Sequence, residues 1–259
     1  MSAAAINPKG PSIVPKGKSI FAWVETYLGS SVGQKILVGT TGLLLVGFVL
    51  FHMIGNLKMF SGRESINKYA YFLKHDLGAL ILIARAGLLG LFVVHLFLAI
   101  RLKLRSKAAR PIGYAKQNVA QANPASTTMI WTGLVTLAFV LFHLAHYTFG
   151  WIHQVSVDGG TTNYLELKDA DGRHDVYAMV KAGFGQVWLS LIYLVCQLLL
   201  FVHLSHGIAS SLQTLGLVGK KFTPAARLAG WAISGAIFAG NFAIVMAVWL
   251  DPWLKLLPE

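Results

Sequence analysis

The sequence predicts an all-α membrane protein built as a bundle of five transmembrane helices. Only 12% of its 259 residues are charged, about half the share found in typical soluble domains, and the mean hydropathy is +0.61. The chain also contains five continuous apolar runs. Each has the ~20 residues that a helix needs to cross a hydrocarbon core of ~30 Å.

The five predicted spans are separated by polar connections and flanked by two tails. They cover about residues 36–57, 77–100, 128–151, 187–210 and 229–250. The runs are continuous rather than alternating, which favours helices over the strands of a membrane barrel. Residues 1–35 form a tail and a short amphipathic segment. We expect this segment to lie on the membrane surface, with a plain polar lead-in as the alternative. Residues 251–259 form a C-terminal tail.

The net charge of +12 is distributed unevenly between the two ends of the spans. Thirteen Lys and Arg residues fall in the N-terminal tail and in the second-to-third and fourth-to-fifth connections, against one acid, Glu25. The remaining connections and the C-terminal tail hold eight basic residues against nine acids. The positive-inside rule then predicts a cytoplasmic N-terminus and an external C-terminus in a bacterial-type inner membrane. We expect these basic loops to face the membrane surface and its lipid, and we expect no nucleic acid.

Six of the nine histidines lie inside the predicted spans. An ionisable side chain at such a depth marks by default a cofactor, a partner or a pathway. The predicted orientation sorts these histidines into two levels. The outer level holds His52 with His143 and His146, and the inner level holds His95 with His203 and His206.

Two imidazoles from facing helices are what a b-type haem needs as axial ligands. Zinc would want three or four ligands at one level, and no span contains Asp or Glu. The lone cysteine, Cys196, rules out an internal disulfide and a covalent C-x-x-C-H haem site. Histidines that only hydrogen-bond helix to helix are the alternative. Arg85, charged and well inside a span, would pair with a haem propionate or extend to the surface.

Four stretches of the chain resemble the diheme cytochrome b558 membrane anchor of succinate dehydrogenase and fumarate reductase, the succinate:quinone oxidoreductases. They are GFVLFHMIGN, FVVHLFLAIRLK, WTGLVTLAFVLFHLAHY and FVHLSHGIASSLQTLG. The resemblance covers the chain from about Phe21 onward. In the third stretch it selects His143, ten residues beyond the Gly of a T-G pair. In the fourth it selects His206, which precedes a Gly.

The resemblance implies two haem b groups in the five-helix bundle. His52 and His143 would hold the distal, outer haem, and His95 and His206 would hold the proximal, inner haem. His146 and His203 would then bind propionates, line a quinone pocket or be ordinary core residues.

The resemblance also implies a flavoprotein subunit and an iron–sulfur subunit docked on the cytoplasmic side. Electrons would pass from the iron–sulfur subunit through the proximal and distal haems to a quinone, more usually menaquinone. The chain would not oxidise succinate by itself, but it would help to form the quinone site. The direction of the reaction and any higher oligomer of the complex are left open.

Candidates for the quinone site gather at the outer end of the bundle, near the distal haem. They are Asn56, Lys58, Arg63, Lys74 and His75, and an ordinary surface loop is the alternative reading of these residues. Two other functions are open for the whole chain. The first is a stand-alone transmembrane cytochrome b reductase. The second is a haem-free transporter or anchor in which the histidines serve helix packing.

Overall fold

A computed structural model describes residues 19–109, 124–157 and 160–258, and this part of the chain is mostly helical. Five helices are long and apolar enough to cross a membrane, which confirms the predicted spans. They are α2 (Ser31–Asn56), α4 (Gly78–Ala108), α5 (Pro124–His143), α7 (Val187–Thr214) and α8 (Thr223–Leu254). The N-terminal tail up to residue 18, and Arg110 and Lys116 of the basic second-to-third connection, lie outside the described residues.

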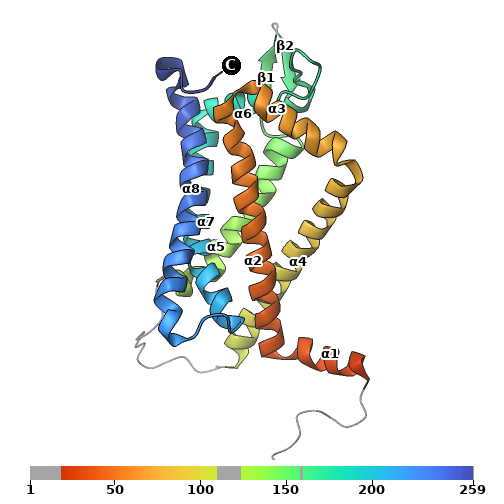
Figure 1. Cartoon of the computed structure of the whole chain (residues 1–259), viewed down its shortest axis with the longest axis vertical. Helices are drawn as coiled ribbons and strands as arrows, with labels where there is room; N and C mark the ends of the chain where they lie inside the picture. The colour runs from red at the N-terminus through yellow and green to blue at the C-terminus, as the bar shows by residue number, and fades with distance from the viewer. Residues whose placement is uncertain (1–18, 110–123, 158–159, 259) are drawn as a thin grey trace, which may run out of the picture.

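The shorter elements gather at the two ends of the bundle (Figure 1). We call one end the cap end. It carries η1 (Leu57–Ser61), α3 (Arg63–Tyr71), η2 (Phe72–Asp76), η3 (Leu144–Thr148), the antiparallel strands β1 (Gln154–Val157) and β2 (Gly160–Asn163), η4 (Tyr164–Glu166) and α6 (Val176–Gly185). The opposite, α1 end carries α1 (Ile20–Gly29) and η5 (Lys220–Phe222).

The predicted amphipathic segment contains a separate helix, α1, that runs across the end of α2 (Figure 1). Ser30 separates the two helices, because its hydroxyl accepts from the backbone N–H of Gly33 and caps α2. Arg105 at the end of α4 donates to the carbonyl of Gly29 at 3.0 Å and to Gln34 at 3.3 Å. The span therefore begins at Ser31, five residues earlier than predicted, and the joint between α1 and α2 is tied to α4.

Helices α2, α7 and α8 form the most closely packed part of the bundle. Small residues allow the backbones to approach, as in other membrane helix pairs. A Cβ at Gly230 of α8 would lie 2.5 Å from the Ser205 carbonyl oxygen of α7, and one at Gly240 would overlap Met53 of α2. The buried side chains of this core are Met53, Leu200, Leu204, Ile208 and Ile237.

Helix α4 lies at the edge of the bundle. It meets α2 near the α1 end and diverges from it toward the cap end (Figure 1). Leu98 is its only buried residue. The apolar run that predicted this span ended near Ile100, but the helix continues to Ala108. Basic residues in its last turns, such as Arg105 and Lys107, favour the negative end of a helix.

The connection between α5 and α7, which the predicted orientation places outside the membrane, contains fully buried side chains. Tyr164 and Tyr177 within it are fully buried. Tyr177 belongs to an apolar cluster with Met59, Ile66 and the C-terminal half of α8. The cap is thus fixed to the ends of α2 and α8, and it covers the cap end of the bundle.

Candidate functional site

The cap-end histidine level joins His52 of α2 to His143 of α5. The centroids of the two imidazole rings lie 5.9 Å apart, and the ring planes are at 86°. Two imidazoles bound to one metal from opposite sides, through bonds of about 2 Å, have centroids about 6 Å apart. The structure therefore brings together the two residues that the sequence paired at the outer level, at a spacing that suits a shared iron.

His146, the neighbour of His143, occupies a closed polar site. It is fully buried, with Nδ1 2.9 Å from the Tyr193 hydroxyl and Nε2 3.2 Å from the Tyr164 hydroxyl. Both ring nitrogens are engaged, so neither remains for a metal. His143 contacts the Tyr193 hydroxyl through Nδ1 at 3.2 Å. This contact leaves the Nε2 of His143 as the nitrogen that a metal ion would bind.

The second histidine level begins with His95 of α4, which lies against α2. Its Nδ1 is 3.1 Å from the carbonyl oxygen of Val38 and 3.2 Å from the Thr41 hydroxyl. A Cβ at Gly42 would lie 3.1 Å from Cε1 of this imidazole. A glycine beside the threonine thus leaves room for the ring, and the two hydrogen bonds hold its Nδ1 edge.

His203 of α7 lies against α5 in the same manner. Its Nδ1 is 3.2 Å from the Thr132 hydroxyl. A Cβ at Gly133 would lie 3.3 Å from its Cε1. His203 interacts electrostatically with His95 across the bundle. The two rings are thus held by matching Thr-Gly pairs on two different helices.

His206, which the resemblance selected as the fourth ligand, is placed differently. Its ring interacts electrostatically with Arg227 of α8. No hydrogen bond to its ring is found within the described residues. At the inner level, His95 and His203 are the histidines whose rings are held through Nδ1. The geometry therefore favours His203 over His206 as the partner of His95.

A sequence signal for this choice lies in an internal repeat. Residues 41–52 read TGLLLVGFVLFH and residues 132–143 read TGLVTLAFVLFH, and the two copies match at most positions. On both α2 and α5, the repeat places the Thr-Gly pair nearer the α1 end and the histidine nearer the cap end. At a rise of about 1.5 Å per residue, the 11 residues from threonine to histidine separate the levels by about 16 Å.

The helices that follow each copy also correspond. Each carries a Val-His-Leu triplet, with His95 in α4 and His203 in α7. Three residues beyond these histidines stand Leu98 in one copy and His206 in the other. His146 likewise has a glycine, Gly55, as its counterpart in the first copy. The four histidines that recur are therefore His52, His95, His143 and His203.

Arg85 projects from the exposed surface of α4. Within the described part of the chain it has no hydrogen-bond or ion-pair partner. A Cβ added at Gly87 or Gly90, further along the same helix, would meet no neighbouring atom within 4 Å. This stretch of α4 therefore has open space beside it, and the predicted pairing of Arg85 with a propionate stays a prediction.

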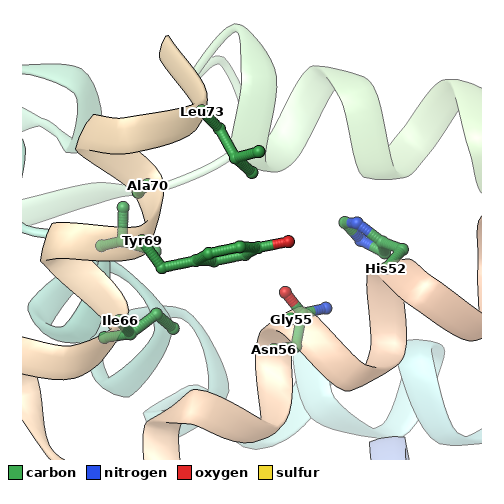
Figure 2. Close-up of a pocket in the computed structure, with 8 residues that line it drawn as sticks. His52, Gly55, Asn56, Ile66, Tyr69, Ala70 and Leu73 are labelled. Carbon is green, nitrogen blue, oxygen red and sulfur yellow. The ribbon is translucent and has the colours of Figure 1, made fainter. Parts of the chain in front are cut away.

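A cavity of about 160 Å³ adjoins His52 at the cap end (Figure 2). Figure 2 shows Tyr69 of α3 extending across it, with the phenol hydroxyl directed toward His52. Gly55 makes room for this ring, because a Cβ there would lie 2.8 Å from Cε1 of Tyr69. The lining residues are His52, Gly55, Asn56, Ile66, Tyr69, Ala70, Leu73 and Val176.

The five residues predicted for the quinone site are not gathered in one place. Asn56 lines the cavity, and the Lys58 ammonium lies 5.4 Å from the ring centroid of Tyr69. Arg63 forms an ion pair with Asp175 at 3.5 Å. Lys74 and His75 belong to η2, where His75 is exposed and stacks on Tyr71. Tyr69 was missed because a tyrosine in a polar connection carries no spacing signal.

Arg63 belongs to a polar network in the cap, separate from the two histidine levels. The Asn67 amide, which is fully buried, donates to Asp169 at 3.2 Å and to Asp175 at 3.1 Å. Arg173 forms ion pairs with Asp169 at 2.8 Å and with Glu64 at 2.6 Å. The network ties α3 to the segment before α6.

The charges of this network shift its pKa values. Burial raises the pKa of Asp169, but hydrogen bonds from Arg173 and Asn67 outweigh it and hold this pKa below its usual value. Hydrogen bonds from Arg173 and Lys68 lower the pKa of Glu64. Burial lowers the pKa of His174, which lies beside the network.

Among the described residues, no three His, Cys, Asp or Glu side chains are grouped so as to hold a metal ion. The candidate site therefore consists of pairs of histidines at two levels, with a cavity beside the cap-end pair. Comparison of the chain with protein-family models, with curated proteins and with solved structures gave no match.

Proposed function

We propose that this multi-pass membrane protein is the membrane-anchor and electron-transfer subunit of a succinate:quinone oxidoreductase. The observation that carries the proposal is the pairing of histidines at two levels on four helices of one bundle. The ring centroids of His52 and His143 lie 5.9 Å apart, and His95 and His203 interact electrostatically at the other level. Two bis-histidine haem b groups would account for both pairs.

The residues present fit such a group. A histidine that binds a metal almost always donates its other ring N–H to a carbonyl, a carboxylate or a water. His95 has this arrangement through the Val38 carbonyl, and His203 has the Thr132 hydroxyl at its Nδ1. His143 has a tyrosine hydroxyl in the same place. Bound there, haem iron would supply one-electron transfer between the two ends of the bundle.

We assign the fourth ligand to His203 in place of His206. The Thr132 contact and the Val-His-Leu correspondence with His95 both support this choice. His206 then becomes a neighbour of Arg227, and His146 a core residue with both nitrogens bonded.

The cavity beside His52 is the proposed quinone site. It is smaller than a typical ligand pocket of about 300 Å³ or more. We therefore propose that it takes only the head group of a quinone such as menaquinone, with the apolar tail in lipid. Asn56 and the Tyr69 hydroxyl supply polar groups there. The basic residues at the α1 end would receive the iron–sulfur and flavoprotein subunits.

Purification of the complex from membranes in mild detergent tests the proposal. We expect a reduced-minus-oxidised spectrum with a b-type α band, two haems per chain, and co-purifying flavin and iron–sulfur signals. Two haems without flavin or iron–sulfur would assign the chain as a stand-alone transmembrane cytochrome b. A preparation without haem would contradict both redox functions and leave a transporter or structural anchor.

A further inference from the structure

Two threonine hydroxyls make the contacts that distinguish the α1-end histidine level. Thr41 Oγ1 lies 2.7 Å from the Leu37 carbonyl oxygen and 3.2 Å from His95 Nδ1. Thr132 Oγ1 lies 3.1 Å from the Met129 carbonyl oxygen and 3.2 Å from His203 Nδ1. Both threonines are buried, and both directly precede the glycine that makes room for the ring.

The hydrogen-bond chain determines where the protons lie. A carbonyl oxygen only accepts, so the Val38 oxygen, 3.1 Å from His95 Nδ1, requires a proton on that nitrogen. The single hydroxyl proton of Thr41 is then donated to a carbonyl one turn back in its own helix, and its oxygen accepts from Nδ1–H. Thr132 is placed in the same way: its hydroxyl proton is donated to the Met129 carbonyl one turn back, and its oxygen is left to accept from Nδ1–H of His203.

From this we infer that Thr41 and Thr132 are positioning residues for the α1-end haem. Each fixes its histidine as the Nδ1–H tautomer, which leaves the Nε2 lone pair for iron. Each also accepts from the Nδ1–H group, which makes the imidazole a stronger donor to iron and stabilises the ferric state. This inference rests on the proposed function, because it assigns roles around the same histidines.

Among the described residues, no threonine hydroxyl contacts a histidine of the cap-end level. His52 is exposed and contacts the rings of Phe48 and His143, and His143 uses a tyrosine hydroxyl. The two levels thus differ in how their ligands are hydrogen-bonded, and substitution of the threonines should affect one haem alone.

The test is a redox titration of the whole complex, with EPR spectra of the ferric haems, for Thr41→Val and Thr132→Val. Valine keeps the shape of threonine and removes the oxygen. We expect a positive shift in the midpoint potential of one haem in each variant, a changed ferric EPR signal for that haem, and no change in the other. Thr41→Ser should restore both properties. If the valine variants instead lose the α1-end haem alone, and Thr41→Ser retains it, that result would also support the inference.

Two neighbouring threonines serve as matched controls. Thr40 is exposed on α2, and Thr136 of α5 donates to the Thr132 carbonyl rather than to a histidine. Thr40→Val and Thr136→Val should leave both potentials unchanged. The inference would be overturned if Thr41→Val and Thr132→Val left both midpoint potentials unchanged, or if they shifted both potentials equally or removed both haems. Potential shifts of the same size in the control variants would overturn it as well. A haem-free wild-type complex would instead contradict the proposed function itself.

Discussion

His52 and His143 lie on different helices, far apart in the chain, yet their imidazoles are in contact, with centroids 5.9 Å apart. The Tyr193 hydroxyl contacts Nδ1 of His143 and orients its ring. His52 stacks one face of its ring on Phe48 and lines the cavity.

The first prediction concerns this pair. We expect His52→Ala or His143→Ala to remove one haem and leave the other, because each haem needs both axial ligands. Haem content by pyridine haemochrome should fall from two to one per chain. The haem that is lost should be the same in both variants, as judged by its midpoint potential. Loss of different haems in the two variants would disprove the pairing.

The second prediction separates His203 from His206. His203→Ala should remove the haem that His52→Ala retains, and His95→Ala should give the same spectrum. His206→Ala, the matched control three residues away, should keep two haems because its ring has no contact with the Thr-Gly pairs. The reverse result, with haem lost only in His206→Ala, would restore the ligand set implied by the resemblance.

The sequence was sufficient for the five spans and for the two levels of histidine. Apolar length sets the number of spans, and the position of a histidine along its helix sets its depth. The choice within each level depended on side-chain direction, which spacing alone does not give for residues three positions apart on one helix face. The resemblance selected His143 and His206, and both selections stay predictions. The structure adds the Nδ1 contacts of His143 with Tyr193 and of His203 with Thr132, which the His-Gly pair does not reveal.

The cap was less predictable than the spans. Its order depends on contacts between segments distant in the chain, such as Asn67 with Asp175. Such contacts leave no local periodicity in the sequence. The cavity at Tyr69 has the same origin, since it forms only where α3 folds back over the end of α2.

The third prediction concerns stability at His146. His146→Leu should keep both haems but leave the buried Tyr164 hydroxyl without this partner, at a cost of about 1–3 kcal/mol, whereas the Tyr193 hydroxyl keeps its contact with His143. The melting temperature of the complex in detergent should fall. Adding Tyr164→Phe to this variant should recover part of the loss, because it removes one unpaired hydroxyl. Loss of haem in His146→Leu would contradict the assignment of His146 as a core residue.

The fourth prediction is a pH dependence of the cap. The pKa of Asp169 is lowered in the folded cap, so its ion pair with Arg173 stabilises the cap above the unfolded pKa of about 3.9 and is lost as pH falls through the lower folded value. In Arg173→Met, burial remains and raises this pKa, so the cap should open at a higher pH. Hydrogen exchange of α3 and η4 against pH measures the shift.

A matched control for this variant is Lys68→Met. Lys68 pairs with Glu64 on the surface, with 66% of its side chain exposed, and such pairs contribute little to stability. Its pH profile should match that of the wild type. Equal profiles for Arg173→Met and the wild type would show that the network does not hold the cap.

The fifth prediction tests the cavity beside His52. Tyr69→Phe removes the hydroxyl that faces His52 across the cavity (Figure 2). If the quinone head group binds there, this variant should raise KM for a soluble menaquinone analogue and leave the haem content at two. Gly55→Ala should have a larger effect, because its Cβ would displace the Tyr69 ring. Tyr71→Phe is the control, since Tyr71 is exposed and stacks on His75. Equal KM values for Tyr69→Phe, Tyr71→Phe and the wild type would place the quinone elsewhere on the bundle.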